Sequence, residues 1–333
     1  MPRQARLDAP GTLHHVMGRG IDRATIFVGD ADRDDFVRRL AELCREGALV
    51  IYAWALMPNH FHLLVRTGAT PLGQSMKRLL TGYVVNFNRR HHRSGHLFQN
   101  RYKSIVCEDD PYLLELTRYI HLNPLRSNVV ARLADLHRYP WTGHAALMGR
   151  VARPWQDTAT VLGYFSRRRR QAIERYVAFV AEGVPRGRRP ELVGGGLVRS
   201  LGGWAQVLPL RRRGVQIASD ARILGDGDFV ERIRRDAARQ VGETLRLSRK
   251  IVDLPVLAKS ISAHTAVPDA ELRSGSRRPE VVRARRLFCQ VAVKAMGHSG
   301  AAAARFLGVT TSSANRLAMS EALSDLRKIL NAL

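Results

Sequence analysis

The chain has 333 residues, 45% of them hydrophobic, with 54 Lys and Arg against 29 Asp and Glu and a net charge of +25. This composition excludes an intrinsically disordered chain, and no apolar run approaches the roughly 18 residues of a membrane-spanning helix. The N-terminus lacks the apolar segment of a signal peptide, and the three scattered cysteines are typical of reduced thiols. We therefore expect a cytoplasmic protein of two or three domains.

The charge indicates a polyanionic partner, because excess Lys and Arg attract phosphates and release their counterions. A coding bias toward Arg is the alternative, since there are 48 Arg and only 6 Lys. Such a bias exchanges Lys for Arg but does not remove acidic residues, so nucleic acid is the expected partner. Residues 1–150 carry +8 and ten of the twelve histidines, and the remainder carries +17.

Residues 1–150 alternate between extended and helical patterns. We expect extended segments at 12–18, 49–57, 60–67 and 97–106, and helices at 30–46, 71–91 and 109–122. This order predicts an α+β domain with helices packed on an antiparallel sheet. Residues 151–250 form a basic connecting region with one basic helix after 167, and 251–333 form a helical domain.

The segment 299–318 predicts a helix-turn-helix, with Gly308 at the turn. The apolar positions that would bury the elbow are Ala303, Ala304, Leu307, Val309, Ala314 and Leu317. A second helix from Thr310 or Thr311 would present DNA contacts at Thr311, Ser312, Ser313, Asn315 and Arg316. An ordinary αα-hairpin is the alternative.

The helix before this motif, at 279–297, is expected to bury Val282, Leu287, Val291 and Ala292, with Arg283, Arg285 and Arg286 on other faces. In helix order and spacing, the stretch from residue 251 resembles the C-terminal DNA-binding domain of the replication initiator DnaA. It has Val-Thr-Thr-Ser-Ser where that family has Asp-His-Thr-Thr, so origin specificity does not carry over.

The strand MPNHFHLLV places His60 and His62 around Phe61. Side chains alternate along a strand, so the two imidazoles point the same way with Cα atoms about 6.6 Å apart. They could share one divalent ion. The alternative is a pair of exposed histidines on a sheet face.

The helix at 109–122 carries a polar stripe of Glu115, Tyr119 and Asn123 beside its apolar face. Pro124 ends the helix near Asn123, which leaves the Asn123 amide oxygen available as a ligand. Taken alone, Tyr119 could equally be structural, with its ring packed and its hydroxyl in water.

Together these motifs resemble the REP-associated tyrosine transposases of the single-tyrosine HUH transposase superfamily. The resemblance covers residues 1–145 and includes HHVMGRGIDRATIF, WALMPNHFHLLV, GHLFQNRYKS and YIHLNPLR. It implies that Tyr119 attacks a phosphate of single-stranded DNA, leaving a 5′-phosphotyrosine and a free 3′-hydroxyl. It also implies Mg²⁺ or Mn²⁺ held by His60 and His62, with Asn123 as a third ligand.

The resemblance further implies a ferredoxin-like sheet with the histidines on a central strand and the tyrosine helix across it. The expected substrate is hairpin-forming single-stranded DNA, with phosphate contacts from Arg19, Arg23, Arg101 and Lys103, and we expect nucleoid association. The oligomeric state stays open between monomer and homodimer. Two other functions stay open: a non-catalytic DNA-binding regulator using the helix-turn-helix, and a metal-dependent phosphodiesterase that needs no tyrosine.

Overall fold

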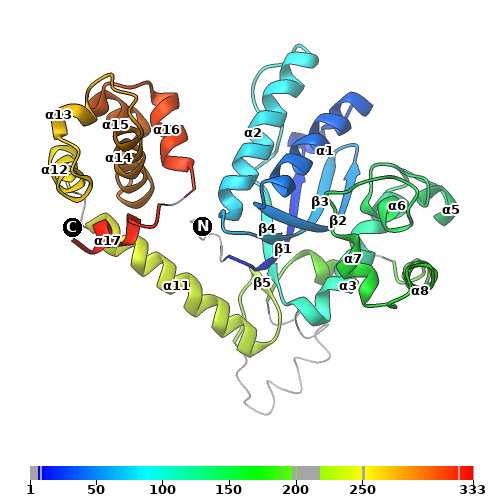
Figure 1. The fold of residues 1–333 in the computed structure, drawn as a ribbon. Coiled ribbons are helices and arrows are strands. Elements are labelled where there is room, and N and C mark those ends of the chain that lie inside the picture. Colours follow the sequence, from blue (N-terminus) through cyan, green and yellow to red (C-terminus); the bar gives the residue numbers. More distant parts are fainter. Residues whose placement is uncertain are drawn as a thin grey trace. The chain divides into compact units, whose positions relative to one another are not determined.

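A five-stranded sheet organises the first part of the chain in the computed structural model (Figure 1). Its strands are β1 (Leu13–Arg19), β2 (Leu49–Met57), β3 (His60–Thr67), β4 (Lys103–Cys107) and β5 (Ile223–Leu224). Their order is β2-β3-β1-β4-β5, with β5 parallel to β4 and all other neighbours antiparallel. The structure describes residues 7, 10–187, 189–196, 200, 218–249, 252–321 and 323–332.

The first four strands and the two helices between them form a ferredoxin-like unit. Helix α1 (Asp30–Arg45) connects β1 to β2, and α2 (Leu72–Arg90) connects β3 to β4. Combined with the strand order β4-β1-β3-β2, this connectivity is the split βαβ arrangement. The predicted α+β fold is therefore confirmed.

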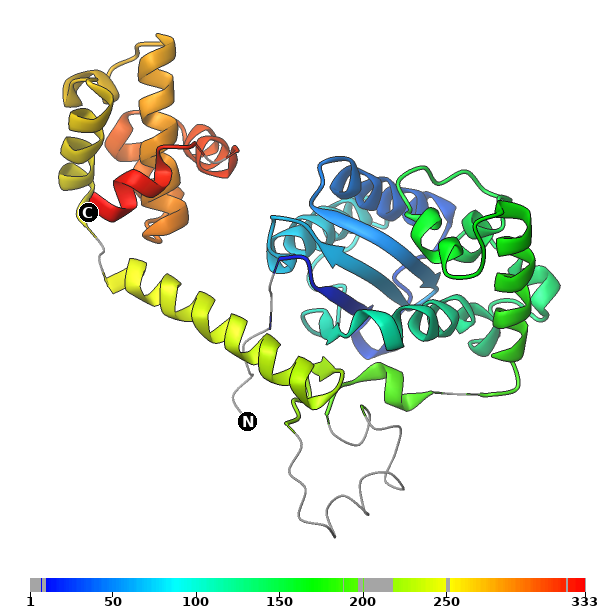
Figure 2. The same ribbon diagram turned by 60° about the horizontal axis from the view of Figure 1, so that its bottom comes forward.

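Helices cover both faces of this sheet (Figures 1 and 2). On one face α1 and α2 pack on Phe61, Leu63 and Val65 of β3. On the other, α3 (Asp109–His121) lies across β2 and β3, over the core that contains Leu64. Because strand side chains alternate, His60 and His62, which flank Phe61, belong to the α3 side.

The first compact unit extends further along the chain than the predicted boundary at residue 150. It spans Met1–Ala237, because Val161, Ala172 and Tyr176 are buried in the core under α3. Residues 201–217 of the expected connecting region lie outside the described residues. The elements between α3 and residue 193 are α4 (Asn123–Arg126), α5 (Leu133–Leu136), α6 (Gly143–Leu147), α7 (Thr158–Gly163), α8 (Arg169–Glu182) and the short 3-10 helix η2 (Pro190–Val193). Another 3-10 turn, η1 (Ile21–Arg23), follows β1.

The predicted extended segment at 97–106 is only partly a strand. Strand β4 begins at Lys103, and the residues before it form a loop in which Phe98 makes an isolated bridge to Gly20. Leu97 is buried in the core under α1 and α2. The apolar residues at 97 and 98 therefore serve core packing, which a strand-like pattern does not distinguish from pairing.

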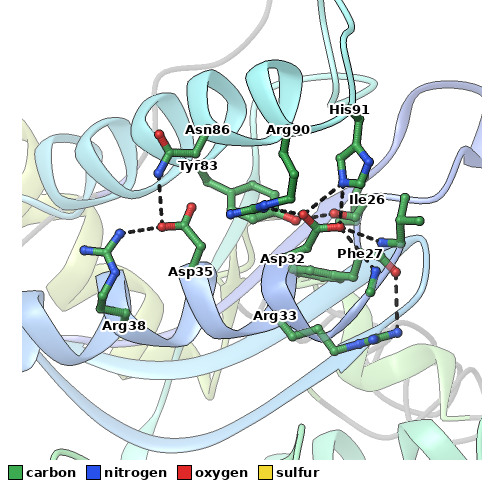
Figure 3. Close-up of polar contacts among 12 residues, drawn as sticks. Ile26, Phe27, Asp32, Arg33, Asp35, Arg38, Tyr83, Asn86, Arg90 and His91 are labelled. Carbon is green, nitrogen blue, oxygen red and sulfur yellow. Dashed lines mark hydrogen bonds and ion pairs between the residues drawn. The ribbon is translucent and has the colours of Figure 1, made fainter.

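A buried carboxylate joins the start of α1 to the end of α2 (Figure 3). Asp32 accepts hydrogen bonds from the backbone nitrogens of Val28 (2.9 Å) and Gly29 (3.3 Å), which caps α1. The same carboxylate contacts Arg90 and the Nε2 of His91 at 2.9 Å. Burial would raise the pKa of Asp32, but the hydrogen bonds from His91, Arg90 and the two backbone nitrogens outweigh it and lower that pKa.

The second compact unit, Ala238–Leu333, is helical. Its elements are the end of α11 (Gly227–Arg249), α12 (Leu254–Thr265), α13 (Asp269–Leu272), α14 (Pro279–Cys289), the π-helical turn η3 (Gln290–Ala295), α15 (Gly300–Leu307), α16 (Thr311–Met319) and α17 (Leu326–Ala332).

Helix α14 corrects two predictions. Val282 is 39% exposed, and Val281 occupies the buried position instead. Arg285 does not project outward: it is buried and donates to backbone carbonyls, including that of Leu272 at 2.7 Å. The π-helical turn η3 follows α14 directly.

Helices α15 and α16 meet at the predicted turn. Gly308 has a φ of 66°, the left-handed conformation that favours glycine. Thr310 caps α16 by accepting from the backbone nitrogen of Ser313 at 3.1 Å. The predicted elbow residues Ala303, Ala304, Leu307 and Ala314 are buried, and Val309 and Leu317 are partly buried against the same core.

Candidate active site

Three histidines and one tyrosine gather on the sheet face that α3 covers. His60 and His62 come from β3, His15 from β1 and Tyr119 from α3. The ring centres of His60 and His62 are 5.4 Å apart, and that of Tyr119 is 5.8 Å from His62 and 5.9 Å from His15. The cluster brings the sequence-predicted His60, His62 and Tyr119 together within one chain.

His60 is held as a neutral imidazole. Its Nδ1 lies 2.7 Å from the Oδ1 of Asn59, whose Nδ2 in turn donates to the carbonyl of Arg23 at 3.2 Å. Burial, aided by the nearby Arg19, lowers the pKa of His60 to about 4. The Nδ1 proton is therefore donated to Asn59, and the lone pair of His60 is on Nε2.

His62 is buried deeper, beside His15. Its Nδ1 lies 2.9 Å from the Nε2 of His15, and the Nδ1 of His15 lies 3.0 Å from the carbonyl oxygen of Leu192. Burial lowers the pKa of His62 well below its usual range, with smaller contributions from His15 and His60. Burial likewise lowers the pKa of His15 to about 4, so both rings are neutral at pH 7.

The ring plane of Tyr119 is nearly perpendicular to the rings of both buried histidines, at 76° to His15 and 81° to His62. The guanidinium of Arg126 lies 5.5 Å from the centre of the Tyr119 ring. Burial is the main reason that the pKa of Arg126 is lowered. The Nη2 of Arg126 donates to the Gly183 carbonyl at 3.1 Å, whereas its Nε and Nη1 are buried without a hydrogen-bond partner among the described residues.

Asn123 is buried at the start of α4, directly after the tyrosine helix. Its Nδ2 donates to the backbone carbonyl of Tyr119 at 3.0 Å. The amide is thereby anchored to the helix that carries the tyrosine. Its Oδ1 is the atom that would serve as a ligand.

A pocket of about 380 Å³ opens beside the histidines. The predicted phosphate contacts Arg19, Arg101 and Lys103 line it together with His60 and His62, whereas Arg23 is exposed and lies outside its lining. The Nζ of Lys103 donates to the carbonyl of Val193 at 2.6 Å. The pocket thus combines nitrogen ligands with positive charge, which suits a phosphodiester.

The donor set is sparse for a metal centre. Within the described ranges, no three side chains of His, Cys, Asp or Glu are grouped so as to hold a metal ion. Two imidazoles that bind one ion at about 2.1 Å bring their ring centres to roughly 5 to 6 Å of each other. The 5.4 Å between His60 and His62 fits that requirement, and an amide oxygen and solvent would complete the shell.

Sequence reasoning did not identify His15, Arg126 or the backbone of 192–193 as part of this site. The adjacent His14 and His15 offered a signal, because one of any two neighbours on a strand must face the α3 side. Which of them does so depends on the pairing of β1 with β3, in which Met17 lies opposite His62.

The predicted DNA contacts of the second unit are accessible on α16. Thr311, Ser312, Asn315 and Arg316 are exposed, while Ala314 and Ala318 face the core. Asn315 packs against α15, since a Cβ added at Gly300 would lie 1.9 Å from its Oδ1. The described part of the chain contains no helix long and apolar enough to cross a membrane.

The first compact unit thus places a His-Phe-His strand of a ferredoxin-like sheet opposite a helix that carries a tyrosine. Residues 11–123 match the family described as "Transposase IS200 like". A solved structure of a REP-associated tyrosine transposase bound to a REP hairpin is 15% identical, with a TM-score of 0.38, and the match covers 47% of this chain and 90% of that chain. No curated protein sequence matches the chain.

Proposed function

We propose that the N-terminal unit is a metal-dependent single-strand DNA transesterase that cleaves and rejoins hairpin-forming DNA through a 5′-phosphotyrosine. The observation that carries the proposal is the position of Tyr119, whose ring centre lies 5.8 Å from that of His62 on the sheet face that α3 covers. A tyrosine with a merely structural role does not require two neutral imidazoles and a cationic pocket beside it. The transposase family of residues 11–123 supports this chemistry.

In the proposed reaction the Tyr119 oxygen attacks a phosphorus atom of the single strand and loses its proton. The bond from phosphorus to the 3′-oxygen breaks, and that oxygen takes up a proton as the free 3′-hydroxyl. The phosphate stays on Tyr119 as a diester, so attack by a 3′-hydroxyl reverses the step without ATP. Arg126 stabilises the negative charge that develops on the tyrosine oxygen, and Arg19, Arg101 and Lys103 hold the phosphates.

His60, His62 and Asn123 would hold Mg²⁺ or Mn²⁺. The ion would polarise a phosphate oxygen and spread the charge of the transition state. Phosphate oxygens favour Mg²⁺ and two imidazoles favour Mn²⁺, so both ions are candidates. The exposed polar face of α16 supports a second role, in which the C-terminal unit binds duplex DNA and keeps the enzyme at the nucleoid.

The test uses labelled hairpin single strands from the gene's own locus, incubated with the full chain and Mn²⁺ or Mg²⁺ and resolved on a denaturing gel. Wild type should form a covalent adduct, and Tyr119→Phe should form none. The matched control is Tyr112→Phe, because Tyr112 lies on the same helix and its hydroxyl donates to the Ser200 carbonyl (3.0 Å), so adduct formation should persist.

Each competing function has its own outcome in this experiment. Cleavage by Tyr119→Phe would favour the metal-dependent phosphodiesterase. Tight binding of the strands by wild type, with neither cleavage nor adduct, would favour the non-catalytic regulator. Either result would overturn the transesterase.

A further inference from the structure

We propose that His15 and the backbone carbonyl of Leu192 are positioning groups that set the tautomer of His62, so that its Nε2 carries the lone pair offered to the ion. This inference deepens the function proposed above and rests on the metal-binding role given there to His62. Neither His15 nor Leu192 is required to touch the DNA or the ion.

The contact between His15 and the carbonyl of Leu192 determines which ring nitrogen of His15 donates and which accepts. The oxygen of Leu192 can only accept, so the Nδ1 of His15, 3.0 Å away, must carry a proton. His15 has no exposed surface, and a second ring proton would leave a cation buried against another imidazole. The Nε2 of His15 is therefore the acceptor in its bond to His62.

The hydrogen bond between His15 and His62 then fixes the tautomer of His62, the proposed metal ligand. The Nδ1 of His62 lies 2.9 Å from the Nε2 of His15 and must donate its proton there. The lone pair of His62 is then on Nε2, the tautomer that His60 adopts through Asn59. A metal-bound histidine usually donates its other ring proton to a carbonyl or carboxylate, and here a second histidine relays that role.

Leu192 belongs to a part of the chain that lies outside the family match of residues 11–123. Its side chain is buried in the core under α3, which places η2 against the sheet. The next residue, Val193, lines the pocket and accepts the hydrogen bond from Lys103 at 2.6 Å. The segment after α8 thus completes the wall of a site whose other residues come from the transposase domain.

The direct test reads the tautomer in the metal-free full chain. Histidine labelled with ¹⁵N is observed by long-range ¹H–¹⁵N correlation at pH 7, and the signals of His62 are assigned with a His62→Ala variant. We expect His62 to be protonated on Nδ1 and unprotonated on Nε2. A proton on Nε2 in the wild type would overturn the inference.

Variants then test the consequence for the ion. His15→Leu keeps the volume but removes the acceptor, so Mn²⁺ affinity measured by calorimetry should fall by about 10- to 100-fold, and the His62 proton should redistribute to Nε2. His15→Gln retains a donor and an acceptor and should recover most of the affinity. The matched control is His14→Leu, since His14 is a buried neighbour on β1 that bonds Ser104 instead (3.1 Å).

The outcomes separate this inference from the function on which it rests. A folded His15→Leu variant with wild-type Mn²⁺ affinity and an unchanged His62 tautomer would overturn the positioning role alone. Wild type that shows the Nδ1 proton on His62 but binds no Mn²⁺ would overturn the metal-dependent function and leave the tautomer assignment standing.

Discussion

His60 and His62 are neutral, so they offer nitrogen lone pairs rather than charge to a metal ion. Both rings are buried enough that the pKa of His60 falls to about 4 and that of His62 falls well below its usual range. The positive charge of the pocket comes instead from Arg19, Arg101 and Lys103 at its edge. The cations would therefore bind a phosphodiester, and the neutral nitrogens could bind a divalent ion beside it.

Gly18 of β1 leaves room for the ring of Phe61, which lies opposite it on β3. A Cβ at this position would lie 2.3 Å from Cε1 of the Phe61 ring, between the two histidines. We expect Gly18→Ala to lower the free energy of unfolding by about 1 to 3 kcal/mol, because the added methyl group would overpack the core around Phe61. Gly163→Ala is the control, since its Cβ would meet nothing within 4 Å. Equal denaturant midpoints for the two variants would contradict this packing.

At the residue scale, the sequence predicted the side chains whose position follows from local periodicity. His60 and His62 share a face because strand residues alternate, and Tyr119 was recognised within a helical stripe and a motif. His15 was missed because its role depends on long-range strand pairing and on the carbonyl of Leu192. A backbone group leaves no trace in a side-chain pattern.

At the scale of elements, Asp32 links α1 to α2 on the sheet face opposite α3. We expect Asp32→Asn to lower the free energy of unfolding at pH 7 by about 2 kcal/mol, since Arg90 and His91 lose a buried anionic partner. The lowered pKa of Asp32 means that its stabilisation is full above the ordinary carboxyl value of 3.8 and is lost as pH falls through the folded value.

Thermal unfolding of both proteins across pH 7 to pH 2.5 checks this account. The gap between the melting temperatures of wild type and Asp32→Asn should narrow on the acid side of the range. A gap that stays constant to the lowest pH would show that the charge of Asp32 does not carry its contribution.

Most elements of the first compact unit followed from the sequence, and the exceptions have physical causes. Strands β2 and β3 have the predicted bounds, since both are strongly apolar segments bounded by turn residues. Strand β5 was missed because its two residues gain their pairing from β4, far away in sequence. Helix α14 was found, but its buried face carries Val281 and Arg285 rather than Val282.

At the scale of the whole molecule, the compact unit that holds His60, His62 and Tyr119 ends at Ala237 rather than near residue 150. The segment after α3 buries Tyr176 and Leu192 and supplies the carbonyl that holds His15. A chain cut at 150 would expose this core. Functional experiments therefore belong on the full chain.

The geometry also predicts in which subunit the tyrosine acts. Tyr119 faces His62 of its own chain at 5.8 Å, so each chain should carry a complete site. Mixing full-length Tyr119→Phe with full-length His60→Ala should leave adduct formation at background. Restored adduct in the mixture would show that two chains exchange their tyrosines.

The most direct measurement of the central claim is the site of covalent attachment. A hairpin strand is trapped on the full chain with Mn²⁺, the protein and DNA are digested, and the modified peptide is sequenced by mass spectrometry. We predict a 5′-linked nucleotide on the Tyr119 hydroxyl. Strand cleavage without any protein–DNA bond, or attachment to a different residue, would contradict the account.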